Sequence, residues 1–210
     1  MAVYTKINQK EINIINKNFN INKVISFKGI KQGIENTNYL LKSKKKKYIL
    51  TIFEKRVLQK EIPFFMKLMD NLNNSKINCP KPLKTKENKY LIKLKNKTAC
   101  IVSFLEGKDK KILNINDCYA IGKTIARMHV VTNKMKLNRK NSMGIRNLKP
   151  LLESIKFKSK KFSNLKVFLK NNLKDINKNW PKQLPKGIIH GDLFIDNICL
   201  LYTSPSPRDS

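Results

Sequence analysis

The prevailing spacing of the apolar residues changes at Gly107 of this 210-residue chain, and that change limits the fold more than any other feature. Before Gly107 the apolar residues gather in short β-prone runs, and after it they recur every three or four residues, as in helices. We therefore predict an α+β protein, β-rich first and α-rich second, with a boundary near 105–108. The β-prone runs predict strands at 24–30, 38–42, 48–53, 90–94 and 98–104.

Three stretches have the period of a helix. Within the β-rich half, apolar residues on one face and Pro63 in a first-turn position predict a helix over residues 63–72. In the second half, Asn116 fits the N-cap of a second helix. A third helix is predicted over residues 162–180, and Pro181 ends it.

The chain is strongly basic, with a formal net charge of +31. Clustered Lys and Arg favour nucleic-acid binding, yet only 5 of the 45 basic residues are Arg, the side chain most used to read bases. The densest run, Lys44 to Lys47, lies between two predicted strands, where a solvated hairpin turn is expected. We expect no specific nucleic-acid partner, and a basic nucleic-acid-binding module remains the alternative.

Cysteines and apolar runs give the expected compartment. No two cysteines form a C-x-x-C pair, and only two histidines are present to complete a metal site. The N-terminus has no apolar signal region, and no apolar run approaches the roughly 18 residues of a membrane span. We expect a reduced, cytoplasmic protein without a membrane partner, whereas its oligomeric state stays open.

The segment HGDLFIDN, residues 190–197, gathers polar groups on a predicted loop between two short apolar strands. An Asp five residues before an Asn suits phosphoryl transfer, with Asp192 as the base and Asn197 as a ligand of Mg²⁺. The alternative is that both are ordinary turn residues. His190 fits a structural histidine that holds the loop.

Two other chemistries lack their sequence signals. A Ser-His-Asp hydrolase of the nucleophile-elbow type needs a G-x-S-x-G motif, and the chain has none. A thiol enzyme needs a cysteine placed beside a histidine, and no spacing favours such a pair. Hydrolytic catalysis is therefore not expected.

HGDLFIDN resembles the catalytic loop of the aminoglycoside-phosphotransferase and choline-kinase group, and within that group the chain is similar to the homoserine kinases. The resemblance implies a two-lobed protein-kinase-like fold and ATP-dependent, Mg²⁺-requiring phosphorylation of L-homoserine, a step of threonine biosynthesis. Another hydroxyl acceptor, of the aminoglycoside or choline type, remains the alternative. The resemblance to the homoserine kinases rests on the segments MAVYT, GIENTNYLL, YILTIFEKRV, IPFFMKLMDNL, IVSFLEG and LPKGIIHGDLFIDN.

The resemblance also implies the site residues. Asp192 is expected as the catalytic base, Asn197 as the metal ligand, and His190 and His129 as structural residues. The nucleotide is expected to bind at a loop and at a hinge. The loop residues are Gly33, Asn36, Thr37 and Asn38, and the hinge residues are Ser103, Phe104 and Leu105.

Two departures from the family pattern stand out. Thr51 occupies the third-strand position where these kinases carry a basic residue, and either Lys55 or Arg56 lies close enough to be considered in its place. The last residues, LLYTSPSPRDS, contain no Lys, Asn or Ile, which predicts a non-native tail and a shortened chain with little or no activity. The predicted domains are a nucleotide-binding lobe (1–105), a partial catalytic lobe (106–199) and the tail (200–210).

Overall fold

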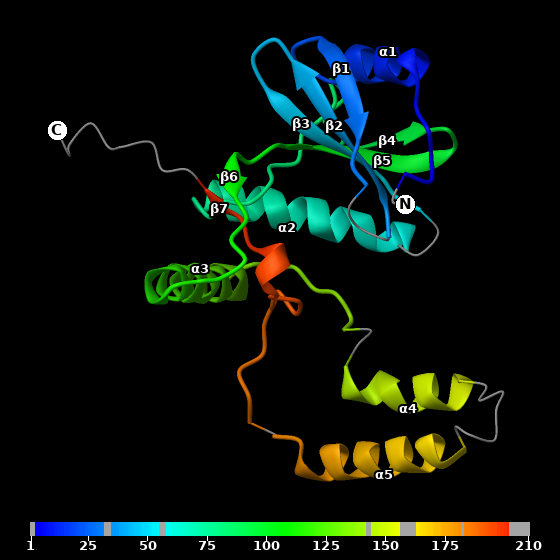
Figure 1. Cartoon of the computed structure of the whole chain (residues 1–210), viewed down its shortest axis with the longest axis vertical. Coiled ribbons are helices and arrows are strands. Elements are labelled where there is room, and N and C mark those ends of the chain that lie inside the picture. Colours follow the sequence, from blue (N-terminus) through cyan, green and yellow to red (C-terminus); the bar gives the residue numbers. More distant parts are fainter. Residues whose placement is uncertain are drawn as a thin grey trace. The chain divides into compact units, whose positions relative to one another are not determined.

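A computed structural model describes residues 3–31, 35–54, 58–141, 144–155, 163–181 and 183–201 of the chain (Figure 1). The chain divides into two compact units. The first contains Met1–Leu137 and Ile188–Ser210, and the second contains Asn138–Gly187. The predicted lobe boundary at residue 105 lies inside the first unit and stays a prediction.

A five-stranded antiparallel sheet forms the centre of the first unit, in the order β1-β2-β3-β5-β4. The strands confirm the predicted runs to within one residue at either end. The Lys-rich turn also joins two strands as expected, where the Ser43 amide donates to the carbonyl of Lys46 at 2.9 Å. The strands are β1 Val24–Gly29, β2 Thr37–Ser43, β3 Lys47–Ile52, β4 Leu91–Leu94 and β5 Lys97–Ser103.

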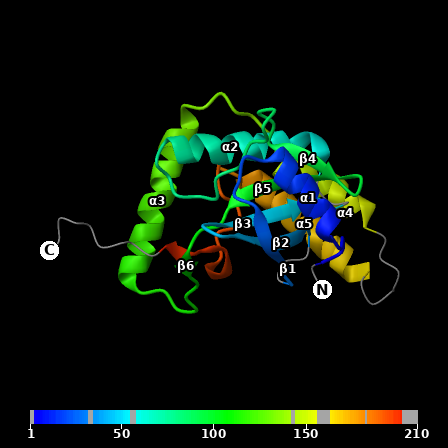
Figure 2. The same ribbon diagram turned by 90° about the horizontal axis from the view of Figure 1, so that it is seen from above.

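The two faces of the sheet bury different helices, α1 (Gln9–Asn18) and α2 (Ile62–Asn74). On one face, Ile12 and Ile15 of α1 pack in the main apolar core with alternate residues of β2, β3 and β5. On the other face, Ile62 and Met66 of α2 pack against Cys100 of β5 and its neighbours. Figures 1 and 2 show the two helices on opposite sides of the sheet. The alternating pattern of each strand therefore fills two cores.

The remaining helices follow β5. The short strand β6 (Gly107–Lys108) precedes α3 (Ile115–Asn133), and the second unit holds α4 (Ile145–Ser154) and α5 (Ser163–Asn179), which pack on each other. The first unit resumes with the 3-10 turn η3 (Ile195–Asn197) and β7 (Leu200–Leu201), and η1 (Gln59–Glu61) precedes α2. The α+β class and the change of period at Gly107 are confirmed.

Several local predictions need correction. Helices α1 and α4 were not predicted from the sequence. The N-cap of α3 is Asn114 rather than Asn116, because Asn114 and Asp117 exchange side-chain and backbone hydrogen bonds in a capping box. The described residues 183–189, which lead into HGDLFIDN, contain no strand, and β7 follows the motif.

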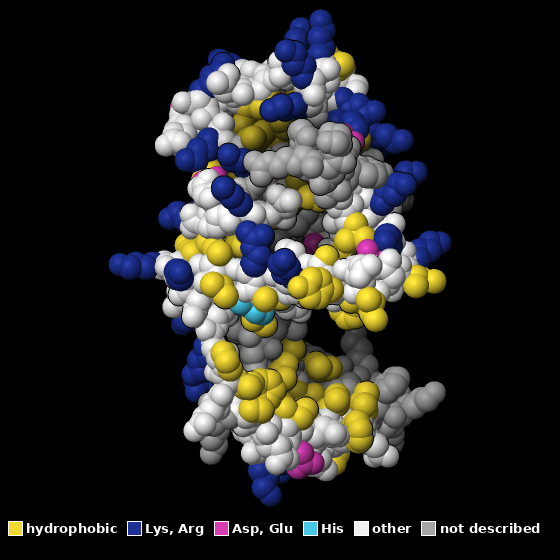
Figure 3. Space-filling view, turned by 90° about the vertical axis from the view of Figure 1, so that its left-hand side faces the viewer, with side chains coloured by type: hydrophobic (Ala, Val, Ile, Leu, Met, Phe, Trp, Pro, Cys, Tyr) yellow, Lys and Arg dark blue, Asp and Glu magenta, His cyan; other side chains and the backbone are white. Residues whose placement is uncertain are grey.

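The distribution of basic side chains and the composition of the helices are relevant to nucleic-acid and membrane partners. In the view of Figure 3, Lys and Arg side chains are spread over the surface rather than gathered in one patch. In the described part of the chain, no helix is both long and apolar enough to cross a membrane.

Candidate active site

The loop that ends at η3 brings the two predicted catalytic residues together. The Asn197 side-chain nitrogen Nδ2 donates to the Asp192 carboxylate oxygen Oδ2 at 2.9 Å and to the Asp192 carbonyl at 2.9 Å. Gly191, just before Asp192, has a φ of +76°, a conformation that L-residues with side chains rarely adopt. Both polar side chains are exposed to solvent. The geometry presents a carboxylate and an amide oxygen from one tight turn.

The three described residues of the predicted nucleotide loop are all hydrogen-bonded to β3 or to the residues that follow it. Asn36 Oδ1 accepts from the backbone N–H of Glu54 at 3.3 Å, and Asn38 Oδ1 accepts from the Thr51 hydroxyl at 2.8 Å. Thr37 donates its hydroxyl to Glu54 at 2.7 Å. Gly33 lies outside the described residues. The start of β2 is therefore held in place by hydrogen bonds to β3 and to Glu54, which follows β3.

Asn38 and Thr37 point to opposite faces of the sheet. Asn38 lies opposite Thr51, and Thr51 lies opposite Cys100, which packs with α2. Directly opposite residues in antiparallel strands share a face, so Asn38 lies on the α2 face. Thr37 is fully buried on the other face, with Tyr39 of the α1 core. Only Asn38 of this pair faces the α2 side.

The predicted hinge residues end β5 and follow it. The Ser103 amide donates to the Lys81 carbonyl at 2.9 Å, and the Phe104 amide donates to the Lys47 carbonyl at 3.2 Å. The Lys47 ammonium also lies 5.4 Å from the centre of the Phe104 ring. In the described chain, the backbone of Leu105 makes no such bond. Both backbone groups of Leu105 are therefore without a backbone hydrogen bond among the described residues.

A two-stranded ladder joins the segment after the predicted hinge (103–105) to the segment after the predicted catalytic turn (190–197). Gly107 of β6 pairs with Leu201 of β7, and Lys108 pairs with Leu200. A Cβ atom at Gly107 would lie 2.6 Å from both Cys199 Sγ and the Leu200 carbonyl oxygen, so only glycine permits this approach. The predicted hinge and the predicted catalytic turn are far apart in sequence, and this ladder joins the chain a few residues after Leu105 to the chain a few residues after Asn197.

Comparison with known proteins shows which family the chain belongs to. The family described as "Phosphotransferase enzyme family" (APH) matches residues 26–206 of this chain. The chain belongs to this family. Homoserine kinase of Paramagnetospirillum magneticum is 38% identical over 202 residues, which cover 96% of this chain and 62% of that protein. Homoserine kinase of Methylocella silvestris is 36% identical over 202 residues, covering 96% and 63%. The chain thus spans less than two thirds of these curated relatives.

Solved structures agree with the fold of the phosphotransferase family. A microcompartment-associated aminopropanol kinase matches with a TM-score of 0.68 at 15% identity, covering 95% of this chain and 66% of that one. A spectinomycin phosphotransferase, solved with ADP and spectinomycin, matches with a TM-score of 0.60 at 17% identity, covering 96% and 67%. The kinase-like α+β fold expected from the sequence is therefore confirmed.

The expected departure from the family pattern in the third strand stays a prediction. Thr51, at the position expected to be basic, uses its hydroxyl to bond Asn38. Lys55 and Arg56, the two candidates for its replacement, lie outside the described residues. Lys97, at the start of β5, forms an ion pair with Glu54 on the α1 side of the sheet. The basic group that would hold phosphates stays unassigned.

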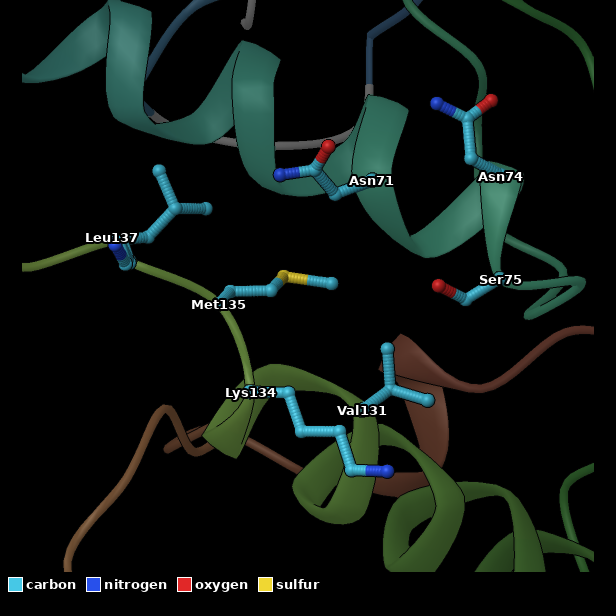
Figure 4. Close-up of a pocket in the computed structure, with 8 residues that line it drawn as sticks. Asn71, Asn74, Ser75, Val131, Lys134, Met135 and Leu137 are labelled. Carbon is cyan, nitrogen blue, oxygen red and sulfur yellow. The ribbon is translucent and has the colours of Figure 1, made fainter.

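The two histidines and a pocket near α2 and α3 add little to the site. The side chains of His129 on α3 and of His190 are both exposed, and their structural roles stay predictions. A pocket of about 540 Å³ opens between the end of α2 and the end of α3 (Figure 4). None of its lining residues is a predicted site residue; they are Asn71, Asn74, Ser75, Val131, Lys134, Met135, Lys136 and Leu137.

Proposed function

We propose that this phosphotransferase-family chain transfers the γ-phosphoryl group of ATP to the hydroxyl of L-homoserine, giving O-phosphohomoserine and ADP. The observation that carries the reaction type is the hydrogen-bonded pair of Asp192 and Asn197 at the catalytic turn. The choice of acceptor is supported by the curated relatives, which bear the name homoserine kinase.

Asp192 would act as the general base. Its carboxylate would accept the proton of the substrate hydroxyl while the hydroxyl oxygen bonds to the γ-phosphorus. The bond from that phosphorus to the β–γ bridging oxygen breaks, and ADP leaves. Asn197 bonds only one carboxylate oxygen of Asp192 through its side chain, so the other is available to the hydroxyl.

Asn197 fits the chemistry of a magnesium ligand. Its Nδ2 donates to Asp192, which leaves its oxygen Oδ1 as the available donor atom, and Mg²⁺ prefers oxygen ligands. When bound, Mg²⁺ would neutralise charge on the β- and γ-phosphates. Among the described residues, no group of three or more His, Cys, Asp or Glu is placed to hold a metal.

The nucleotide would bind at the hinge and at the start of β2. The Leu105 backbone, which makes no hydrogen bond in the described chain, would bond the adenine edge beside Ser103 and Phe104. Asn38 would direct its Nδ2 toward a phosphate, because the Thr51 hydroxyl already occupies its oxygen. Asn36, Thr37 and Gly33 complete the proposed loop, although the Thr37 hydroxyl bonds Glu54 and is not a phosphate contact.

The test is turnover with a panel of acceptors. ADP release from Mg²⁺-ATP would be measured with L-homoserine, choline or spectinomycin, and the phosphorylated product identified by mass spectrometry. Homoserine-dependent ADP release supports the proposal, and a clear preference for choline or spectinomycin contradicts it. Calorimetric binding of ATP and then of homoserine is the second measurement. Absence of ATP binding would contradict the nucleotide site.

A further inference from the structure

A carboxylate network lies at the end of β3, beside the proposed nucleotide loop. One oxygen of Glu54, Oε1, accepts hydrogen bonds of 2.7 Å from the hydroxyls of both Thr5 and Thr37. The other, Oε2, pairs with the Lys97 ammonium, which also donates to the Thr5 hydroxyl at 2.7 Å. The network thus joins the N-terminal segment, β2, β5 and the residue that follows Phe53.

The network is buried and charged. The side chain of Glu54 is 10% exposed, Thr37 is fully buried and Thr5 is 7% exposed. Burial by itself would raise the pKa of Glu54, but hydrogen bonds from Lys97, Thr5 and Thr37 outweigh it and keep that pKa below its ordinary value. A buried carboxylate with every oxygen bonded holds its partners in a defined geometry.

Thr37 has no hydrogen-bonding capacity left for a ligand. Its hydroxyl donates to Glu54 and accepts the backbone N–H groups of Tyr4 and Thr5, at 3.0 and 3.1 Å. A hydroxyl has one donor and two acceptor positions, and all are used. The Thr37 side chain therefore serves as an anchor for the start of β2 rather than as a nucleotide contact.

Glu54 binds the loop a second time through its main chain. Its N–H donates to Asn36 Oδ1 at 3.3 Å, while its carboxylate binds Thr37, the next residue. Two adjacent loop residues are therefore tied to one residue of the neighbouring strand. Any shift of Glu54 would move Asn36 and Thr37 together, and Asn38 follows directly in the chain.

We propose that Glu54 is a positioning residue for nucleotide binding. It never touches ATP; it fixes Asn36 and Thr37, and through them it sets where Asn38 presents its amide to the phosphates. This inference rests on the proposed function, because it assumes that the loop binds ATP. It adds that the loop's geometry depends on an ionised carboxylate on the opposite face of the sheet.

The direction in which Glu54→Gln changes the Kd of ATP distinguishes a positioning role from a simple effect of charge. Glu54 is anionic, so by Coulomb's law alone its replacement by Gln would strengthen the binding of the ATP anion. Loss of positioning predicts the reverse. We expect Glu54→Gln to raise the Kd of ATP about tenfold, the scale of one or two lost hydrogen bonds.

Thr37 supplies a matched pair of variants. Thr37→Ser keeps the hydroxyl that bonds Glu54, whereas Thr37→Val keeps the shape and removes it. We expect the Kd of ATP to stay near the wild-type value in Thr37→Ser and to rise as in Glu54→Gln in Thr37→Val. Glu87→Gln is the control for removing a Lys-paired carboxylate, because Glu87 pairs with Lys89 on the exposed surface.

Isothermal titration of the chain with Mg²⁺-ATP distinguishes the outcomes. A purely structural role would lower the binding stoichiometry, because fewer molecules are folded, and would leave the Kd of the folded molecules unchanged; that result overturns the inference. A raised Kd at unchanged stoichiometry in Glu54→Gln and Thr37→Val supports it. Tight ATP binding by wild type and both variants overturns this inference alone, whereas no ATP binding by the wild type overturns the proposed function and the inference with it.

Discussion

The side-chain amide of Asn197 donates one hydrogen bond to the Asp192 carboxylate and another to its carbonyl, each 2.9 Å long. Two bonds from one NH₂ group fix both the main chain and the side chain of Asp192. An amide carries its oxygen opposite its NH₂ group, so Oδ1 of Asn197 is directed away from Asp192. This geometry is compatible with the proposed division of roles, in which Asp192 is the base and Asn197 the metal ligand.

Asp192→Asn tests the base. We expect the rate of phosphoryl transfer to fall about 10²–10⁴-fold, the usual contribution of a general base, with little change in the Kd of ATP. Asp196→Asn is the matched control, since Asp196 is an exposed acid of the same turn. Rates would be measured by coupled ADP release. Wild-type turnover in Asp192→Asn would remove Asp192 from the role.

Asn197→Ala tests the metal ligand. Removing the amide oxygen should raise the Mg²⁺ concentration needed for half-maximal rate, because the ion loses a protein ligand. We expect an increase of about tenfold, the lower end of what altered ligand shells cost in affinity. Asn172→Ala on α5 is the control, since its side chain bonds only the Phe168 carbonyl within its own helix. An unchanged Mg²⁺ requirement in Asn197→Ala would contradict the assignment.

The catalytic turn was predictable because its chemistry is local. Asp192 and Asn197 lie five residues apart, so a single turn brings them together and the sequence spacing already implied it. Glu54 was not found from the sequence because its partners, Thr5, Thr37 and Lys97, come from three separate segments. No spacing rule joins such residues; only the register of β2, β3 and β5 does.

The missed helices had weak or conflicting signals. The start of α1 carries a capping box, Asn8 and Glu11, which is a local signal for a helix start. Helix α4 contains Pro150 in its interior, a residue that lowers helix propensity strongly and argued against a helix there. The strands of the sheet were found because their alternation reflects two buried faces, each packed on a helix.

Gly107→Ala tests the ladder between hinge and catalytic turn. The new methyl would lie 2.6 Å from the Leu200 carbonyl oxygen, so β6 and β7 must separate. We expect a loss of about 1–3 kcal/mol in the free energy of unfolding, the usual cost of overpacking, measured by urea titration.

Gly122→Ala is the opposite control for that experiment. Gly122 lies inside α3, and a Cβ there would meet no atom within 4 Å. Alanine is the better helix former by about 1 kcal/mol, so this variant should be more stable than the wild type. Equal effects of the two substitutions would show that the close approach of β6 and β7 is absent in solution.

The acid sensitivity of the chain should depend on Glu54. Its folded-state pKa lies below the ordinary value of 4.5, so the folded protein binds this proton less tightly than the unfolded chain does. The resulting stabilisation is complete above pH 4.5 and is lost as the pH falls through the lowered pKa. Urea unfolding at pH 7 and pH 3 should therefore show a larger loss for the wild type than for Glu54→Gln. Glu87→Gln should lose nearly as much stability as the wild type. Lys89 also lowers the pKa of Glu87, but solvent screens that exposed ion pair, so the pair contributes little to stability. Equal losses in the wild type and Glu54→Gln would mean that the Glu54 carboxylate is not held by its partners in the folded state.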